Sequence, residues 1–369
     1  MKPKIIAMYL PQFHRIPEND EFWGEGFTDW VTVKKAKPLF EGHQQPRVPL
    51  NNNYYDLSQK ESVAWQAKIA KEYGIYGFGI YHYWFNTEKN ILTKPAEIIR
   101  DNEDIDINYF FAWDNISWKR SWSNVKEKGN AWAPAMEGVE KNIKGPDILI
   151  PFLLGNKHDW QIHFVYLLPF FKDKRYIKIG NKPIFCIFHY EKDMEQMFIY
   201  WDELARENGF DGIFWIFRYL EVSHIPLDKV VFKYEPLYSG WTSHSLCDRV
   251  VNKIKRTFNS VNDVDKYNYD RIWDAILKNA ENMADRNYVH GAFVSYDDTP
   301  RRGMRGKIVE GATPQKFKKY LSKLIEILKV QNKEYLFLTA WNEWGEGACL
   351  EPDTDNQYKY LEAVKAALE

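Results

Sequence analysis

The sequence predicts an α/β fold, a (β/α)8 TIM barrel with long loop insertions on its catalytic face. Short apolar runs of strand length alternate with amphipathic segments of helix length along the chain, and this alternation is typical of a parallel sheet with helical crossovers. The 369 residues contain no internal repeat, low-complexity stretch or Ser/Gly linker. We therefore expect a single catalytic domain over residues 1–369.

Eight apolar runs have the length and composition of strands that are buried on both faces. In chain order they are residues 4–10, 77–83, 109–113, 183–188, 212–217, 230–233, 292–295 and 335–340. Eight parallel strands are what a (β/α)8 barrel requires. A doubly wound open sheet is the alternative, but no G-x-G-x-x-G follows the first run, which argues against its nucleotide-binding form.

The segments between these runs carry the signals of crossover helices. Residues 58–73 open with a serine, which is a favoured N-cap, and residues 194–208 end at Gly209. Residues 313–330 begin with Thr-Pro, a cap followed by a first-turn proline.

Two long stretches interrupt the alternation after predicted strands, at about residues 115–155 and 234–270. In a barrel, the loops that follow strands lie on the catalytic face, so we expect these stretches to shape a substrate cleft. The second contains a Lys/Arg cluster at residues 249–256. We interpret this cluster as a solvated helix face, with an anion-binding role as the alternative.

Polar and aromatic side chains stand at the end of every predicted strand. Because barrel strands end at one mouth, we expect these side chains to converge there. Burying an unpaired carboxylate costs several kcal/mol, so charges at these positions favour a polar cleft lined with rings, a surface on which sugars stack. The residues that we predict to bind substrate are Tyr9, Gln12, His82, Tyr83, Trp84, Trp113, Asp114, Asn115, Tyr234, Glu235, Asp297, Arg301, Trp341, Asn342 and Trp344.

The sharpest pattern follows the last strand, where Trp341 and Trp344 frame Glu343 and Glu346. In a tight turn, positions i and i+3 share a face, so both carboxylates can reach one glycosidic bond. Glycoside hydrolysis needs a protonated acid and an ionised partner, and two close carboxylates in an aromatic pocket separate their pKa values to supply both. We predict that both glutamates are catalytic; the alternative is that they are surface residues of a glycine turn.

The sequence predicts no metal site and no cofactor. His14, His82 and His189 follow three predicted strands, but no HxH or HExxH spacing occurs, so hydrogen bonding to sugar hydroxyls or a structural role is favoured. The three cysteines are widely spaced and form no CxxC pair, which argues against a disulfide framework and a zinc cluster. Acid-x-acid triplets at 104–106 and 353–355 do not directly follow a predicted strand.

Composition excludes several classes of partner. With 50 Lys+Arg against 51 Asp+Glu, the chain has no net basic field to hold nucleic acid or an anionic membrane surface. No apolar run approaches the roughly 18 residues of a membrane span. The first residues are too short and polar for a signal peptide, which predicts a cytoplasmic protein, or a periplasmic or secreted one if a signal was removed. Aromatic residues make up 17%, which fits either a sugar-binding surface or a Trp-rich core.

Five motifs together suggest a family. They are AMYLPQFH at 7–14, WGEGFTDW at 23–30, GIYHYWF at 79–85, DTPRR at 298–302 and AWNEWGEG at 340–347, the last continuing to LEPD at 350–353. In these motifs the chain resembles the WbsX-type proteins, described as lipopolysaccharide-biosynthesis glycosyltransferases, which share a fold with glycoside hydrolase family 99 endo-α-mannosidases. The resemblance covers nearly the whole chain and implies a (β/α)8 barrel.

The resemblance also implies a retaining mechanism with an epoxide intermediate. In it, the first glutamate of Asn-Glu-Trp-x-Glu-Gly is the base on the sugar 2-hydroxyl and the second is the general acid, then base. Carried over, Glu343 is the base and Glu346 the acid/base, with Asn342 beside them. One position departs from the family pattern, because Ile116 replaces an acidic residue after the third strand and Asp114 is its nearest substitute. Mannose specificity is therefore not carried over.

We predict a metal-independent retaining glycoside hydrolase that acts on an α-linked oligosaccharide or polysaccharide. The alternative is a glycosyltransferase of lipopolysaccharide, O-antigen or other surface-polysaccharide biosynthesis. A transferase must hold a diphosphate, and the sequence has neither a glycine-rich cradle nor a convincing metal-binding acid pair. A third possibility is a non-catalytic glycan-binding barrel, against which the intact Glu343 and Glu346 argue. The sequence does not predict an oligomeric state.

Overall fold

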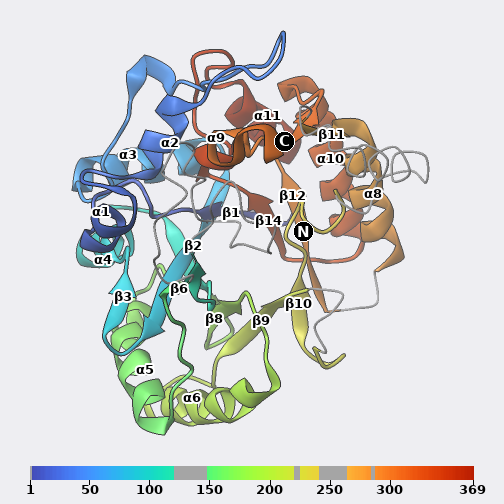
Figure 1. The fold of residues 1–369 in the computed structure, drawn as a ribbon. Coiled ribbons are helices and arrows are strands. Elements are labelled where there is room, and N and C mark those ends of the chain that lie inside the picture. Colours follow the sequence, from blue (N-terminus) through green and yellow to red (C-terminus); the bar gives the residue numbers. More distant parts are fainter. Residues whose placement is uncertain (1, 120–147, 220–224, 241–263, 284–286) are drawn as a thin grey trace, which may run out of the picture.

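A computed structural model of the chain shows a closed ring of eight parallel strands inside a layer of helices (Figure 1). The structure describes residues 2–119, 148–219, 225–240, 264–283 and 287–369. The barrel strands are β1 (Lys4–Tyr9), β2 (Ile75–Asn86), β4 (Asn108–Trp113), β8 (Lys182–Ile187), β9 (Phe214–Arg218), β10 (Val230–Phe232), β12 (Tyr288–Phe293) and β14 (Tyr335–Thr339). Strand β1 pairs in parallel with both β2 and β14, which closes the sheet. The predicted (β/α)8 barrel is confirmed.

The strand bounds differ most from the prediction at β12. This strand begins at Tyr288, four residues before the predicted start at residue 292, and it ends at Phe293 rather than at residue 295. His290 and Gly291 interrupt the apolar run in the sequence, but both are buried inside the strand. Tertiary packing therefore outweighs the local composition here.

Helices cover the outside of the ring, as Figure 1 shows, with α5 and α6 on one side and α8, α10 and α11 on another. The helices are α1 (Pro17–Trp23), α2 (Asp29–Lys35), α3 (Lys60–Glu72), α4 (Lys94–Asp101), α5 (Lys157–Lys172), α6 (Glu195–Glu207), α8 (Tyr269–Asn282), α9 (Thr299–Arg302), α10 (Pro314–Val330) and α11 (Lys359–Leu368).

Two helix starts test the predicted caps. The Thr313 side chain accepts a hydrogen bond from the Lys316 N–H at the start of α10, as predicted. The predicted serine cap of α3 is wrong, because the helix begins at Lys60 after Gln59, whose side chain makes no cap hydrogen bond. Ser58 lies in the preceding turn, where its N–H donates to the Asp56 carboxylate.

Short strands and 3-10 turns lie outside the eight-stranded barrel. They are the strands β3 (Lys89–Ile91), β5 (Trp118–Lys119), β6 (Ile148–Ile150), β7 (Lys178–Ile179), β11 (Asp265–Asn268), β13 (Lys307–Glu310), β15 (Asn342–Glu343) and β16 (Ala348–Cys349), and the 3-10 turns η1 (Leu50–Asn52), η2 (Lys192–Met194), η3 (Gly303–Arg305) and η4 (Trp344–Glu346). Parts of both predicted insertions, at 120–147 and 241–263, lie outside the described residues, and so does the Lys/Arg cluster at 249–256.

Aromatic rings fill much of the core. Inside the barrel, the ring centroid of Phe337 lies 5.3 Å from that of Phe110 and 5.4 Å from that of Phe232, which joins three different strands. Trp201 and Trp273 are fully buried in the helix layer. Burying one large apolar side chain stabilises the fold by about 1.5–3 kcal/mol, so a large share of the aromatic content serves the core.

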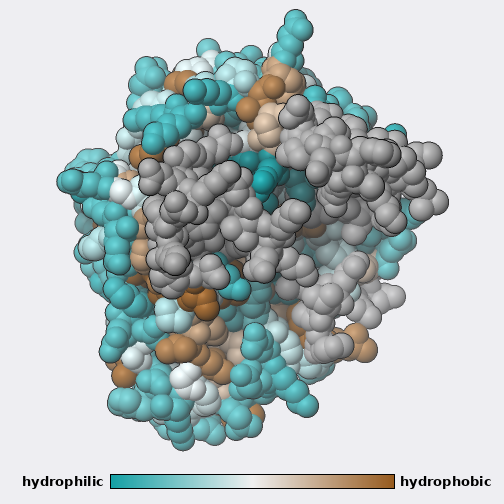
Figure 2. Space-filling view, viewed as in Figure 1, coloured by the Kyte–Doolittle hydropathy of each residue, from teal (hydrophilic) through white to brown (hydrophobic). Residues whose placement is uncertain are grey.

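The surface is mostly hydrophilic on the face drawn in Figure 2, with hydrophobic residues gathered below its centre. Ile148 in β6 and Leu153, between β6 and α5, are 45% and 58% exposed. In the described part of the chain, no helix combines the length and the apolar character that crossing a membrane requires. Cys186 and Cys349 are buried free thiols, whereas Cys247 lies outside the described residues.

Candidate active site

A single guanidinium gathers three carboxylates where the last barrel strand ends. Arg301 of α9 lies with Nη1 3.1 Å from Oε1 of Glu346 and with Nη2 3.3 Å from Oε2 of Glu343. Its Nη2 also lies 3.1 Å from Oδ2 of Asp29, the first residue of α2. All four side chains are buried. The turn β15–η4 places both glutamates on one cation, as their i, i+3 spacing predicts.

This arrangement favours retention of a proton. Burial raises the pKa of Glu346 to about 7, against the lowering effect of the Arg301 charge. Burial, aided by the charge of Glu346, raises the pKa of Glu343 well above its ordinary value. Three ionised carboxylates would outnumber the single guanidinium in a site that excludes water. The pair therefore holds a proton that it can donate.

Gly345 is the residue that lets these groups meet. A Cβ at this position would lie 2.5 Å from Nε of Arg301 and 2.8 Å from Oδ2 of Asp29. Both distances are shorter than a van der Waals contact, and both neighbours are buried. The glycine between the two glutamates is therefore required by the close approach of Arg301 to the turn.

Tyrosines from opposite sides of the barrel surround the Glu343 carboxylate. The hydroxyls of Tyr81 on β2 and Tyr234 after β10 form a hydrogen bond across the interior. The Tyr83 hydroxyl accepts a hydrogen bond of 3.4 Å from Gln12. Burial raises the pKa of Tyr81, Tyr83 and Tyr234 well above their ordinary value, and the charge of Glu343 adds to each shift. These phenols are neutral hydrogen-bonding groups beside the carboxylate pair.

A second polar group lies inside the mouth, at the ends of β4, β8 and β9. Both carboxylate oxygens of Asp114 and Nε of Arg218 are buried without a hydrogen-bond partner in the part of the chain that the structure describes. Nη2 of Arg218 lies 3.1 Å from Nε2 of His189, which lies 3.8 Å from Oδ1 of Asp114. Burial raises the pKa of Asp114 to about 7, against the charge of Arg218.

Seven of the predicted site residues share this interior. They are Gln12, Tyr83, Asp114, Tyr234, Arg301, Glu343 and Glu346. Arg301 and the two glutamates contact one another directly. Tyr83 is close enough to both Asp114 and Glu343 for their charges to raise its pKa, so Tyr83 lies between the two polar groups.

Four predicted site residues lie instead on the outer side of the barrel. The Tyr9 hydroxyl donates to Gln66 of α3. His82 and Trp84 pack on His163 of α5, with Trp84 stacked at 4.1 Å between ring centroids. The expectation that these side chains converge at the mouth is wrong, because alternate residues of a strand point to opposite faces, and Tyr81 and Tyr83 occupy the inner face.

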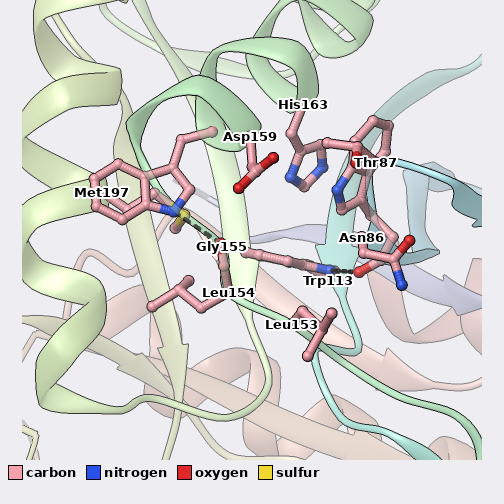
Figure 3. Close-up of a pocket in the computed structure, with 11 residues that line it drawn as sticks. Asn86, Thr87, Trp113, Leu153, Leu154, Gly155, Asp159, His163 and Met197 are labelled. Carbon is pink, nitrogen blue, oxygen red and sulfur yellow. Dashed lines mark hydrogen bonds between the residues drawn. The ribbon is translucent and has the colours of Figure 1, made fainter.

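Trp113 is the fourth of these, and it helps to form a separate pocket of about 110 Å³ between the barrel and the helices α5 and α6. Figure 3 shows His163 and Asp159 of α5 on one side of this pocket, with Leu153 and Leu154 on another. The Trp113 indole donates to the Trp84 carbonyl oxygen, so its polar edge is also used inside the protein.

The two tryptophans that frame the glutamates are structural. Trp344 is buried and its indole donates at 2.6 Å to Oε2 of Glu351, which also accepts from the Tyr55 hydroxyl. Gln66 donates to the other oxygen of Glu351. Trp341 is fully buried and packs on Phe78. The prediction that these two rings line an aromatic substrate pocket is therefore wrong.

The remaining predicted site residues have their polar atoms occupied by the fold. Asn342 accepts a hydrogen bond from the Leu10 N–H and donates one to the Leu10 carbonyl oxygen, which ties the turn β15–η4 to the end of β1. Asn115 likewise donates a hydrogen bond to the His189 carbonyl oxygen and accepts one from the His189 N–H. Ser239 donates twice to Glu235. These three side chains position backbone rather than face the interior.

Asp297 holds the segment that carries Arg301. Although burial opposes its ionisation, hydrogen bonds from His43, Thr299 and Gln45 lower its pKa. Its backbone N–H donates at 2.7 Å to the Glu346 carbonyl oxygen. Asp297 therefore joins α9 to the turn β15–η4, and both of its carboxylate oxygens are already occupied by hydrogen bonds within the protein.

Sequence reasoning missed the third carboxylate and the supports behind the turn. Asp29 lies in the WGEGFTDW motif, which carried the family resemblance but no assigned role. Glu351 lies in the LEPD continuation of the last motif, likewise with no assigned role, and Gln66 shows no sequence signal beyond its apolar neighbours. Among the described residues, no three His, Cys, Asp or Glu side chains are placed to hold a metal ion.

Comparison with protein families gives one match over nearly the whole chain. The model of the family described as Glycosyltransferase WbsX matches residues 5–364. Two curated proteins from two strains of Xanthomonas campestris pv. campestris, both called Uncharacterized protein WxcX, are 30% identical over 377 and 378 residues. These matches cover 99% of this chain and 49% of each relative, so the chain spans about half the length of the curated relatives it matches.

Solved structures share the barrel fold. The GH99 endo-alpha-mannosidase from Bacteroides thetaiotaomicron is 13% identical, with a TM-score of 0.53 over 99% of this chain and 96% of that chain. A second structure, described as a glycoside hydrolase-like protein, is 12% identical, with a TM-score of 0.58 over 100% of this chain and 94% of that chain.

Proposed function

The chain belongs to the glycosyltransferase WbsX family, and from that premise we propose that it is a retaining glycoside hydrolase of α-linked glycans. The observation that carries the proposal is the pair of buried glutamates, Glu343 and Glu346, held on Arg301 with raised pKa values. A protonated and an ionised carboxyl group in one buried site are what glycosidic bond cleavage needs.

The two glutamates take different roles. Glu346, whose pKa is about 7, donates its proton to the departing glycosidic oxygen. Oε1 of Glu343 is buried without a hydrogen-bond partner among the described residues, and it accepts the proton of the sugar 2-hydroxyl. The freed 2-oxygen then bonds to the anomeric carbon as the glycosidic bond breaks, which forms a 1,2-epoxide.

The second half of the reaction restores both groups. Water attacks the anomeric carbon, Glu346 accepts a proton from that water, and Glu343 returns its proton to the 2-oxygen as the epoxide opens. Two displacements at one carbon retain its configuration. With Glu346 protonated, Arg301 faces only the charges of Glu343 and Asp29, which permits Glu343 to ionise.

A glycosyltransferase is the second candidate, because that activity is named in the description of the family. The same carboxylate pair would serve transfer if a sugar hydroxyl took the place of the attacking water. The two candidates differ in the acceptor and in the donor, which for a transferase carries a diphosphate leaving group.

The test is turnover of α-linked oligosaccharides by the purified chain, with products separated by chromatography and the product anomer read by proton NMR. We expect hydrolysis with retention. Glu343→Gln and Glu346→Gln should each lower kcat by about two to four orders of magnitude. Glu362→Gln, at an exposed site on α11, is the matched control and should be unaffected.

Two outcomes would overturn this proposal. Wild-type turnover by either active-site variant would remove the glutamates from the chemistry. Transfer from a sugar nucleotide to a glycan acceptor, without hydrolysis of any α-linked glycan, would establish the second candidate instead.

A further inference from the structure

A cavity of about 520 Å³ lies between α2 and α9 and reaches Arg301. The two helices are in contact and lie side by side in Figure 1. Ligand sites in proteins commonly span about 300–1,000 Å³, so the cavity is large enough for one or two sugar rings. Its Arg301 end adjoins the carboxylate pair, since the same guanidinium binds Glu343 and Glu346.

Two sequence motifs that the proposed chemistry leaves largely unused meet in this cavity. Trp23 and Phe27 belong to the WGEGFTDW motif at residues 23–30, and Thr299 and Pro300 belong to the DTPRR motif at residues 298–302. From these motifs, the catalytic centre itself uses only Asp29 and Arg301. Of the other members, Trp23, Phe27, Thr299 and Pro300 line the cavity.

The described lining is cationic. It contains Lys34, Lys35, Lys37 and Arg301, and it contains no aspartate or glutamate among the described residues. The whole chain has nearly equal numbers of acidic and basic residues, so this local excess is not a property of the protein in general. Three carboxylates neutralise the Arg301 charge. The excess positive charge of the lining therefore comes from the lysines.

Two of the three lysines form neither an ion pair nor a cation–π contact with another described residue. Lys34 lies with Nζ 4.0 Å from the centre of the Tyr54 ring. Lys35 and Lys37 are exposed and make no ion pair with another described residue. Lys35 lies in the last turn of α2, where a cation also complements the helix dipole, but Lys37 lies beyond the helix end.

Apolar and aromatic side chains form the other walls. Trp23 and Phe27 lie with their ring centroids 5.4 Å apart, and Trp23 is only partly buried. Val31 and Leu39 also line the cavity. Rings beside hydrogen-bonding groups suit the apolar faces of sugars, and lysines suit an anionic substituent.

We propose that this cavity binds a sugar unit that carries an anionic group, and that it thereby seats an acidic residue of the glycan next to the linkage at Glu343 and Glu346. This inference rests on the proposed function for the placement of the glycan. The ligand is recognised by charge at Lys35 and Lys37 and by contact with Trp23, so binding does not depend on turnover.

The experiment is isothermal titration of the full chain carrying Glu346→Gln, which prevents turnover. The probes are an α-linked oligogalacturonate, a neutral malto-oligosaccharide of the same length, and UDP-glucose as a diphosphate. We expect the oligogalacturonate to bind best, and a rise in salt from about 0.05 to 0.5 M to weaken it more than the neutral glycan.

Adding Lys35→Gln and Lys37→Gln together should weaken oligogalacturonate binding about tenfold and leave the neutral glycan unchanged. The matched control is Lys318→Gln with Lys323→Gln, two exposed lysines of α10, which should have no effect. Because all four lysines are exposed, these variants are expected to fold, and their melting temperatures check this.

The inference would be overturned if acidic and neutral glycans bound with equal affinity. It would also be overturned if the affinity for the oligogalacturonate were unchanged in the Lys35→Gln/Lys37→Gln variant. If UDP-glucose alone bound in a lysine-dependent manner, the acidic-glycan assignment would be overturned and the cavity would be a diphosphate-binding site. Failure of the hydrolase proposal looks different, because it would be seen as absent turnover by the wild type while the lysine-dependent binding persists.

Discussion

At the scale of single residues, the charge count around Arg301 determines what the site can do. One guanidinium meets Asp29, Glu343 and Glu346 in a buried setting, and a buried charge is tolerated only when it is paired. Protonation of one glutamate brings the cluster closer to neutrality. In the proposed reaction, the acid would thus be supplied by electrostatics already present in the free protein.

Asp114 is the residue whose role is most open to a direct test. Its carboxylate is buried with no hydrogen-bond partner among the described residues, so it lacks the donors that sugar hydroxyls would provide. We predict that Asp114→Ala raises KM roughly ten- to hundredfold, the value of one or two charged hydrogen bonds, with a smaller change in kcat. Steady-state kinetics on the glycan that the wild type cleaves measures both.

The stability of this variant is measured alongside its kinetics. Asp114→Ala also removes a charge that favours the buried Arg218 guanidinium, so we expect its melting temperature to fall, and KM is compared at a temperature at which the variant remains folded. Asp211→Ala, at an exposed site, is the control for KM. An unchanged KM in Asp114→Ala would mean that its carboxylate does not contact substrate.

At the scale of elements, the turn after β14 is held from several sides. Asn342 clamps it to β1, Asp297 binds its backbone, and Glu351 receives hydrogen bonds from Trp344, Tyr55 and Gln66. Catalytic groups must be fixed to within a fraction of an ångström to react efficiently. The framing tryptophans thus contribute through the support they give the turn.

Gly345→Ala should disturb this turn and little else. The added methyl group would meet Arg301 and Asp29 at 2.5 and 2.8 Å, and overpacking of this kind costs about 1–3 kcal/mol. We predict a lower melting temperature and a loss of kcat that exceeds any change in KM, because Arg301 must move from the glutamates. Calorimetry and kinetics on the same preparation measure the two effects.

A glycine elsewhere provides the comparison for this substitution. Gly180 has a φ of +58°, and a Cβ added there would have no neighbouring atom within 4 Å. Asparagine tolerates such a backbone conformation. Gly180→Asn should therefore retain wild-type kcat. If Gly345→Ala also kept full activity and stability, the close approach of Arg301 to the turn would be irrelevant to the reaction.

At the scale of the whole molecule, the sequence was sufficient to predict the barrel and the position of the carboxylate pair. Eight apolar runs correspond to eight strands because a strand buried on both faces has few polar residues. The side of the barrel that each ring occupies was predicted less well. His82 and Trp84 alternate with Tyr81 and Tyr83, and strand periodicity alone would have separated these two pairs.

Other features had no local signal. The hydrogen bond from Gln66 to Glu351 joins segments 285 positions apart, and the side-chain directions in the turn β15–η4 do not follow a strand or helix period. Asp29 reaches Arg301 across 272 positions of sequence. Contacts of this kind are set by tertiary packing, which a single sequence does not encode as a pattern.

Buried carboxyl groups also give the whole fold a pH dependence. Burial raises the pKa to about 7 for each of Asp114, Glu235, Glu346 and Glu351. The folded state thus binds these protons more tightly than the unfolded chain, so the stability they contribute is complete below their unfolded pKa values and is lost as the pH rises through 7.

Buried histidines act in the opposite sense at lower pH. Burial lowers the pKa to about 3 for each of His82, His189 and His290, so folding opposes their protonation below their ordinary pKa. Above about pH 6.5 they are neutral in both states, and the carboxyl groups dominate. We predict that the melting temperature falls between about pH 6.5 and 8, with a shallower slope in Glu235→Gln. A flat or rising profile in the wild type would contradict the prediction.

We expect the glutamate pair on Arg301 to hold a proton near neutral pH, and a titration of the carboxyl groups detects this proton without any substrate. Carbon-13 NMR of protein labelled at the glutamate carboxyl groups, recorded from pH 4 to 9, should show a resonance with a midpoint near 7 that disappears in Glu346→Gln. Titration of the Glu346 resonance near the ordinary glutamate pKa of about 4.3 would show that the pair is fully ionised at neutral pH and cannot supply the acid.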